Sequence, residues 1–291
     1  MTAFDRAAAP GPRRPSSLLL LSEPLRSVLD LGALTVSAPQ LARAPRGDGH
    51  RVLVIPGLLA SDASTLVLRR FLDRLGYRTA GWGLGVNTGP TSRVVRKLPL
   101  RLRELAGQPT AGPEGPEGAD GREAGSTVSV IGWSLGGIFA RALAVRSPEL
   151  VRQVITLGSP YASTVSGQTH ADAAYRMLSR RHAGDAAGRG PDVTTPLTVP
   201  TTSVYSRMDG IVSWRVCRED VGERRESIAV PASHLGFGHS PTALWVVADR
   251  LAQDPGDWRP FVPPRHLRGL FTVDSHLSPP GRAGTGRGAR P

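Results

Sequence analysis

Residues 126–147 read STVSVIGWSLGGIFARALAVRS, and the fold can be worked out from the junction in the middle of this stretch. The first eight residues are a mostly apolar run with β-branched side chains, which predicts a buried strand over 126–133. The following residues carry apolar side chains at helical spacing, which predicts a helix over 134–147. Ser134 stands where the strand turns into the helix, within the pattern G-x-S-x-G.

The pentapeptide alone is a weak signal, because 34 of the 291 residues are glycine. Its context is more specific. A nucleophilic serine on a strand-to-helix elbow needs small residues on both sides, and Gly132 and Gly136 provide them. A helix N-terminus directs N–H groups and partial positive charge toward an anion that forms beside the serine. We therefore predict Ser134 as a nucleophile, with Trp133 as a neighbouring substrate-binding residue.

Strands and helices alternate on both sides of this junction. Further strands are predicted at 51–57, 77–86, 151–158, within 199–210 and at 226–233. Further helices are predicted at 62–75, at about 94–105 and from Pro241 onward, with Ser240 as N-cap. This alternation indicates an α/β fold, a mostly parallel sheet with helices on both faces. Ligands of such sheets bind at the carboxyl ends of the strands.

The chain is predicted to form one domain over 16–265. Residues 1–15 and 276–291 are rich in Pro, Gly and Arg, which predicts disordered tails. Residues 107–125 have a similar composition and are predicted to form a flexible surface loop. Residues 161–198 lie between two predicted strands and are either a small mobile cap or a disordered loop.

A serine hydroxyl needs a general base, and seven histidines are available. His234 follows the strand at 226–233 directly, so it lies at a carboxyl end. His239 lies just before the last helix and is the alternative candidate. Of the others, one precedes the first strand (position 50), two lie within 161–198 (positions 170 and 182), and two lie in or near the C-terminal tail (positions 266 and 276). We predict His234 as the base.

The base in turn needs a carboxylate that fixes its tautomer and stabilises the imidazolium. Asp209 lies in YSRMDGIVS, at the end of the strand that precedes His234. Asp-Gly is also a common turn dipeptide, so a purely structural role is the competing interpretation. Asp220, beside Glu219 in a charged stretch, is the nearest rival and is predicted to be solvated. The predicted order is Ser134, Asp209, His234.

The anion formed during attack needs preorganised N–H donors. The backbone N–H of Leu135, directly after the serine, is one candidate. The second is the N–H of Leu58 in IPGLLAS, where Gly57 lets the backbone come close and contributes to substrate binding. Asn87 lies in the Gly-rich stretch 81–90 and is predicted to line the site. The glycines in that stretch alternate, unlike those of a dinucleotide-binding fingerprint.

With these residues in place, the sequence resembles the α/β-hydrolase superfamily, in particular its bacterial lipase- and esterase-like members. The resemblance spans about residues 50–260 and is carried by VLVIPGLLAS, GWGLGVNTGP, VSVIGWSLGGIFARALA, ITLGSPY, YSRMDGIVSW and SHLGFGHSP. It implies a sheet of about eight strands, esterase chemistry and no cofactor, and it supports Ser134, Asp209 and His234 as a triad. The chain has Pro56-Gly57 where many members have His-Gly. We expect the oxyanion role to survive, since the following backbone carries it.

Composition excludes some other classes. The net charge is +12, but the basic residues are spread along the chain and only Lys97 is a lysine, so nucleic-acid binding is not expected. Cys217 is the single cysteine, which excludes an intramolecular disulfide and a cysteine metal cluster. Its segment SWRVCRED alternates, which predicts a strand with a small core side chain. No metal site is predicted.

The N-terminal run SSLLLLSEP is interrupted by Glu23 and Pro24, too early for a signal-peptide core or a membrane span. A cytoplasmic protein without a transmembrane segment is therefore expected. The sequence predicts a serine hydrolase that cleaves a small-molecule or lipid-like carboxylic ester through an acyl-enzyme. The alternatives are an acyltransferase or thioesterase with the same triad, a non-catalytic hydrolase-like binding protein, and a basic peripheral protein on anionic membranes. Oligomeric state is left open.

Overall fold

The computed structural model describes residues 14–107, 126–162, 168–172, 193–220, 222–254 and 256–274. The predicted tails lie almost entirely outside these ranges, as does the loop predicted at 107–125. Most of the segment 161–198, with its predicted cap, also lies outside them. His182 and His276 fall in the parts that are not described.

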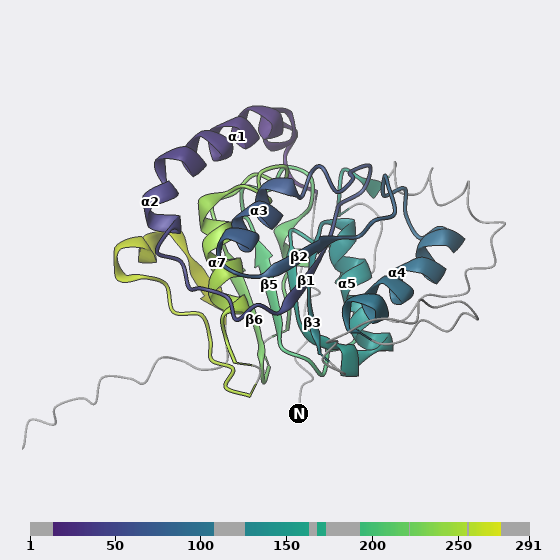
Figure 1. The fold of residues 1–291 in the computed structure, drawn as a ribbon. Helices are drawn as coiled ribbons and strands as arrows, with labels where there is room; N and C mark the ends of the chain where they lie inside the picture. The colour runs from purple at the N-terminus through teal and green to yellow at the C-terminus, as the bar shows by residue number, and fades with distance from the viewer. Residues whose placement is uncertain are drawn as a thin grey trace, which may run out of the picture.

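A seven-stranded sheet runs through the described part of the chain in the order β2-β1-β3-β4-β5-β6-β7 (Figure 1). Its strands are β1 (Arg51–Ile55), β2 (Arg78–Gly81), β3 (Val128–Trp133), β4 (Val151–Leu157), β5 (Thr201–Tyr205), β6 (Arg225–Ala229) and β7 (Thr272–Asp274). Each neighbouring pair is parallel except the antiparallel pair of β6 and β7. The mostly parallel sheet predicted from the sequence is confirmed.

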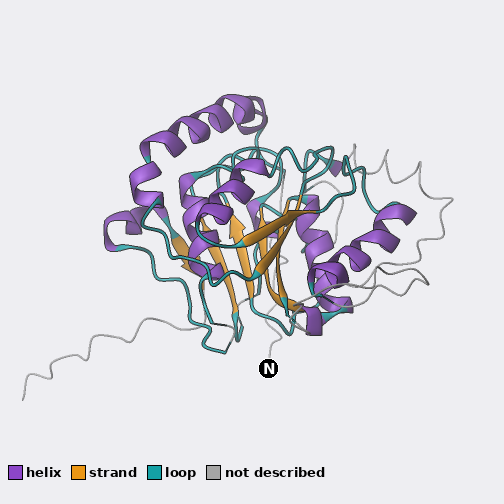
Figure 2. Cartoon of the chain, viewed as in Figure 1, coloured by secondary structure: helices purple, strands orange, loops and turns teal. Residues whose placement is uncertain are grey.

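Helices cover both faces of this sheet (Figure 2). One face packs against α3 (Leu66–Arg74) and α7 (Pro241–Leu251), with α2 (Ala38–Leu41) beyond them, and the other against α4 (Ser92–Leu105) and α5 (Leu135–Arg146). The central strands are therefore buried on both sides, which explains their continuous Val, Ile and Leu runs. The predicted α/β class with helices on both faces is confirmed.

Three expectations about strands need correction. The strand predicted at 77–86 ends at Gly81, because the Asp62 carboxylate accepts the N–H groups of Trp82 (2.9 Å) and Gly83 (3.0 Å) and turns the chain out of the sheet. The alternating segment around Cys217 is no strand and contains the short 3₁₀ helix η2 (Trp214–Val216). The described residues form seven strands rather than about eight, and the last of them lies beyond the predicted domain end at 265.

The N-terminal apolar run is part of a helix that the sequence analysis missed, α1 (Ser17–Val36). It begins with Ser16 as N-cap and continues through Glu23 and Pro24 without a break. Its orientation is unusual, because its one fully buried side chain is the acidic Glu23, which is 1% exposed. The apolar side chains at 18, 21, 25, 28 and 29 are each more than 60% exposed. Polar contacts therefore hold much of α1 against the domain.

Among the described helices, none has the length and apolar character needed to cross a bilayer.

Candidate active site

Ser134 occupies the turn between β3 and α5, as the sequence predicts. Its backbone has φ 53° and ψ −121°, a strained conformation for a residue with a Cβ. Neighbouring bonds hold it there: its N–H donates to the Leu157 carbonyl (2.8 Å), and its carbonyl accepts from Ser159 Oγ (2.6 Å). A strained serine fixed at the carboxyl end of a central strand is the arrangement of a nucleophile elbow.

The two glycines of the motif are required by close backbone contacts at this turn. A Cβ at Gly132 would overlap the Gly136 carbonyl group, and a Cβ at Gly136 would overlap the Ile55 carbonyl group. Helix α5 therefore begins directly against β1 and β3. Its first N–H groups, which have no acceptor within the helix, lie at the carboxyl ends of these strands, beside the serine.

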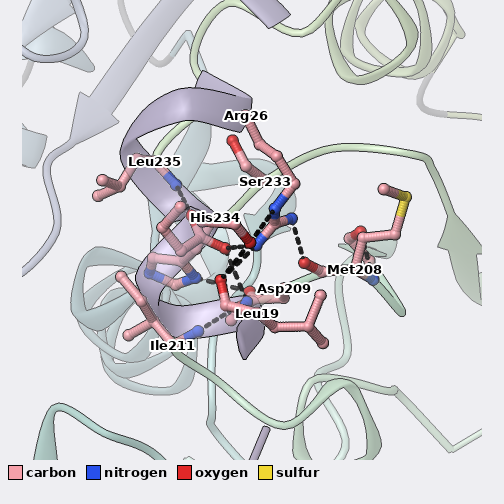
Figure 3. Close-up of polar contacts among 12 residues, drawn as sticks. Leu19, Arg26, Met208, Asp209, Ile211, Ser233, His234 and Leu235 are labelled. Carbon is pink, nitrogen blue, oxygen red and sulfur yellow. Dashed lines mark hydrogen bonds and ion pairs between the residues drawn. The ribbon is translucent and has the colours of Figure 1, made fainter. Parts of the chain in front are cut away.

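Asp209 and His234 form a buried hydrogen-bonded pair at the ends of β5 and β6 (Figure 3). His234 Nδ1 lies 2.6 Å from Asp209 Oδ2. Because an ionised carboxylate only accepts, we assign the ring proton to Nδ1, which leaves Nε2 as the basic nitrogen. Asp209 Oδ1 accepts the N–H groups of Ile211 (2.8 Å) and Val212 (2.7 Å). One carboxylate thus both shapes the turn and orients the histidine.

The surroundings of His234 shift its pKa in opposing directions. Burial lowers the pKa, since it disfavours the imidazolium. The charge and hydrogen bond of Asp209 raise it, and the charge of Glu23 adds to this, so that the net pKa is above the ordinary value. A site that stabilises the imidazolium suits a base that must hold a proton briefly during a reaction.

Trp133 contacts the backbone of His234 and is only 8% exposed. Its Nε1–H donates to the His234 carbonyl (3.1 Å), and the Phe237 ring packs edge-on against the imidazole at 6.2 Å. Trp133 was predicted to bind substrate, whereas these contacts give it a role in fixing the histidine loop. Among the described residues, no hydrogen bond joins Ser134 to His234, so their pairing stays a prediction.

The loop after β1 lies directly against the serine. A Cβ on Gly57 would lie 3.2 Å from Ser134 Cβ and 3.9 Å from its Oγ, so only glycine fits without displacement. The predicted oxyanion donors are the backbone N–H groups of Leu58 and Leu135, and neither has a hydrogen-bond partner within the described residues. Both N–H groups are therefore available to an anion, and their role stays a prediction.

Asn87 is fully buried behind this loop rather than exposed on a wall of the site. Its Nδ2 donates to the Pro56 carbonyl (2.8 Å) and its N–H to the Ala60 carbonyl (2.8 Å), while its own carbonyl accepts from the Leu59 N–H (2.7 Å). The substrate contact predicted for Asn87 is therefore corrected. The side chain fixes the shape of the loop that carries Leu58.

The other candidates are held away from this arrangement. His239 Nε2 lies 2.9 Å from the Ser27 carbonyl oxygen of α1. Asp220 is exposed, as predicted. Cys217 is buried, and burial, with a further contribution from the Asp209 charge, raises the pKa of its thiol, which keeps it protonated and unreactive.

A second Ser-His-Asp set lies at the opposite end of the sheet. His50 Nε2 lies 2.9 Å from Ser129 Oγ, and Asp48 contacts His50 Nδ1. Ser129 is 0% exposed near the amino end of β3, away from the strand-to-helix elbow, so no substrate can reach it. This set is structural, and it shows that the three residue types alone do not define a site.

Sequence reasoning missed three residues of α1 that contact the site loops, namely Glu23, Arg26 and Asp30. Their spacing of three and four residues is the signal that could have revealed one polar helix face. Within the described ranges, no cluster of His, Cys, Asp or Glu side chains is suited to hold a metal ion.

No protein-family model matches the chain, and no curated protein is similar to it in sequence at a significant level. Solved structures are similar to it at low identity. One is an alpha/beta hydrolase fold protein from Nakamurella multipartita, with 18% identity, a TM-score of 0.47, and coverage of 72% of this chain and 94% of that one. Another is a pyrethroid hydrolase from Sphingobium faniae, with 17% identity, a TM-score of 0.43, and coverage of 69% and 97%.

A third is an alpha/beta hydrolase enzyme from the metagenome of lagoon sediments at Mar Chica, Morocco, with 15% identity, a TM-score of 0.45, and coverage of 69% and 90%. The fold class of this chain rests on its own sheet order and on the helices that cover both faces. The chain is an α/β protein with a mostly parallel sheet, and two of the solved structures to which it is similar are described as alpha/beta hydrolases.

Proposed function

We propose that this protein is a serine hydrolase that cleaves carboxylic esters. The observation that carries the proposal is the strained Ser134 elbow at the end of β3, in the same sheet as β5 and β6, whose carboxyl ends are followed by the buried Asp209–His234 pair. Either feature alone has structural explanations, as the Ser129 set illustrates. Their presence at the same edge of one parallel sheet supports a common site.

In the proposed reaction, Ser134 Oγ attacks the ester carbonyl while His234 Nε2 takes the serine proton. The oxyanion accepts hydrogen bonds from the N–H groups of Leu58 and Leu135. The C–O bond of the ester then breaks, and the protonated His234 gives its proton to the leaving alcohol. Water, activated by His234, attacks the acyl-enzyme and releases the acid with regeneration of Ser134.

Two exposed leucines favour an apolar ester. Leu59, directly after one proposed oxyanion donor, is 59% exposed, and Leu235, directly after the proposed base, is 40% exposed. A small apolar ester would remove such side chains from water on binding. The proposed substrate is therefore a small-molecule ester with an apolar acyl or alkyl group.

The test is stopped-flow hydrolysis of p-nitrophenyl esters of increasing acyl length. A burst of one equivalent of nitrophenol, followed by a slower steady rate, indicates an acyl-enzyme. A burst without steady turnover in water, relieved by an added alcohol or thiol, would indicate an acyltransferase instead. Neither a burst nor turnover on any chain length would contradict the proposed function.

His239→Ala tests the choice between the two neighbouring histidines. We expect kcat to change by less than about threefold, because His239 Nε2 contacts α1 and not the serine elbow. The measurement is kcat and KM on the best ester of the series. A loss comparable to that of His234→Ala would show that the base has been assigned to the wrong residue.

A further inference from the structure

Helix α1 contacts the site loops through one buried carboxylate, that of Glu23. Oε1 accepts the N–H of Gly210 (2.7 Å), and Oε2 accepts the N–H of Leu235 (3.1 Å). Gly210 directly follows Asp209, and Leu235 directly follows His234. One side chain therefore bridges the backbone immediately after the proposed acid and immediately after the proposed base.

Two neighbours on the same helix face contact the residues immediately before the acid and the base, and Figure 3 shows the first of them, Arg26, beside Met208. Arg26 donates to the Met208 carbonyl and forms an ion pair with Glu23 (2.8 Å). Asp30 Oδ2 accepts from the Ser233 N–H (3.0 Å) and from its Oγ–H (2.6 Å). The backbone on both sides of Asp209 and of His234 is thus tied to α1.

The contact is close as well as polar. A Cβ on Gly210 would overlap the Leu19 carbonyl of α1, and a Cβ on Gly236 would overlap the Asp30 carboxylate. Glu23 itself is 1% exposed, so its carboxylate has little contact with water. Its hydrogen-bond partners are the N–H groups of Gly210 and Leu235 and the side chain of Arg26. A buried charge that lost these partners would be strongly destabilised, which makes the bridge a rigid connection.

We propose that Glu23 is a positioning residue of the active site, whose carboxylate holds the Asp209 loop and the His234 loop at a fixed separation. This inference rests on the proposed function. Glu23 touches neither the reacting serine nor the pair itself, so it acts through the backbone of Gly210 and Leu235. Loss of the bridge lets the two loops move apart, which weakens the Asp209–His234 hydrogen bond.

Glu23 has an electrostatic consequence that a merely structural contact would lack. Burial, the largest effect, lowers the pKa of His234, and the charge and hydrogen bond of Asp209 raise it. The charge of Glu23 also raises this pKa, by less than Asp209 does. Other charged or titratable groups on the elements packed here include Arg26, Asp30 and His239, together with Cys217 near Asp209 and with Arg207, whose guanidinium lies over the Trp214 ring. Removal of the Glu23 charge therefore lowers the pKa of His234, and the acid limb of kcat/KM moves to lower pH.

The test compares Glu23→Gln with Glu149→Gln, which removes the same charge from an exposed residue next to the amino end of β4. For Glu23→Gln we expect kcat to fall at least about tenfold with KM changed less than about threefold. NMR titration of the His234 ring should give a lower pKa than in the wild type. Glu149→Gln should change neither quantity.

Glu23→Asp keeps the charge on a shorter side chain, and it is the second test variant in case Glu23→Gln does not fold. It should retain the raised pKa of His234 and lose part of kcat. Wild-type kcat together with a wild-type pKa of His234 in Glu23→Gln would overturn the inference, as would wild-type kcat in Glu23→Asp. An inactive wild type would instead contradict the proposed function, and the NMR titration would still decide whether Glu23 acts on His234.

Discussion

Ser134→Ala is expected to abolish ester hydrolysis, with a fall in kcat of about 10⁴-fold or more. The hydroxyl is the proposed nucleophile, and no neighbouring group can replace it. Alanine keeps the Cβ and thus the strained elbow at φ 53°, so the fold should survive. The measurement is steady-state hydrolysis of the best p-nitrophenyl ester, with thermal unfolding of the same sample.

Ser129→Ala is the matched control for this variant. Ser129 is also a serine of β3, it is fully buried, and it lies 2.9 Å from a histidine nitrogen. Its loss should lower the free energy of unfolding by about 1–3 kcal/mol, since His50 loses a buried partner, without a matching loss of kcat. If Ser134→Ala retained a tenth of the wild-type kcat, Ser134 would not be the nucleophile.

Asp209→Asn is expected to lower kcat by about 10³- to 10⁴-fold in a folded protein. The asparagine oxygen can still accept the N–H groups of Ile211 and Val212, so the turn persists. Its NH₂ group then faces His234 Nδ1 and donates to it, which moves the ring proton to Nε2. A protonated Nε2 cannot take the proton of Ser134.

The comparison with Asp209→Ala separates the two roles of this carboxylate. Alanine removes both the turn contacts and the orienting contact, so thermal stability should fall along with kcat. In Asp209→Asn, kcat should fall with little change in the thermal midpoint. An Asp209→Asn protein within about tenfold of wild-type kcat would leave Asp209 only its turn-forming role.

The sequence predicted the fold class and the strand ends because both depend on local patterns. The apolar runs at 51–57 and 126–133 can be recognised within a few residues, and β1 and β3 lie inside them. Ser134, Asp209 and His234 could be proposed from the sequence because each follows such a run, directly or after a short turn. Parallel strands then bring their carboxyl ends to one edge, whatever lies between them in sequence.

The parts that could not be predicted depend on contacts between distant segments. Asn87 was predicted to line the site because the sequence around it does not reveal that its side-chain amide donates to the Pro56 carbonyl, 31 positions away. Helix α1 was missed because several of its polar side chains face inward and most of its leucines face outward, the reverse of an ordinary amphipathic helix. Glu23 therefore looked like an interruption of an apolar run, and its role depends on loops about 190 to 210 residues later.

The most direct test of the account is to locate the covalent adduct of a fluorophosphonate on the folded wild-type protein. The tryptic peptide 123–141 contains Ser126, Ser129 and Ser134, so fragmentation must place the adduct within it. We expect one adduct per chain, on Ser134, which does not form after heat denaturation and forms much more slowly in His234→Ala. An adduct on another residue, or none on the folded protein, would contradict it.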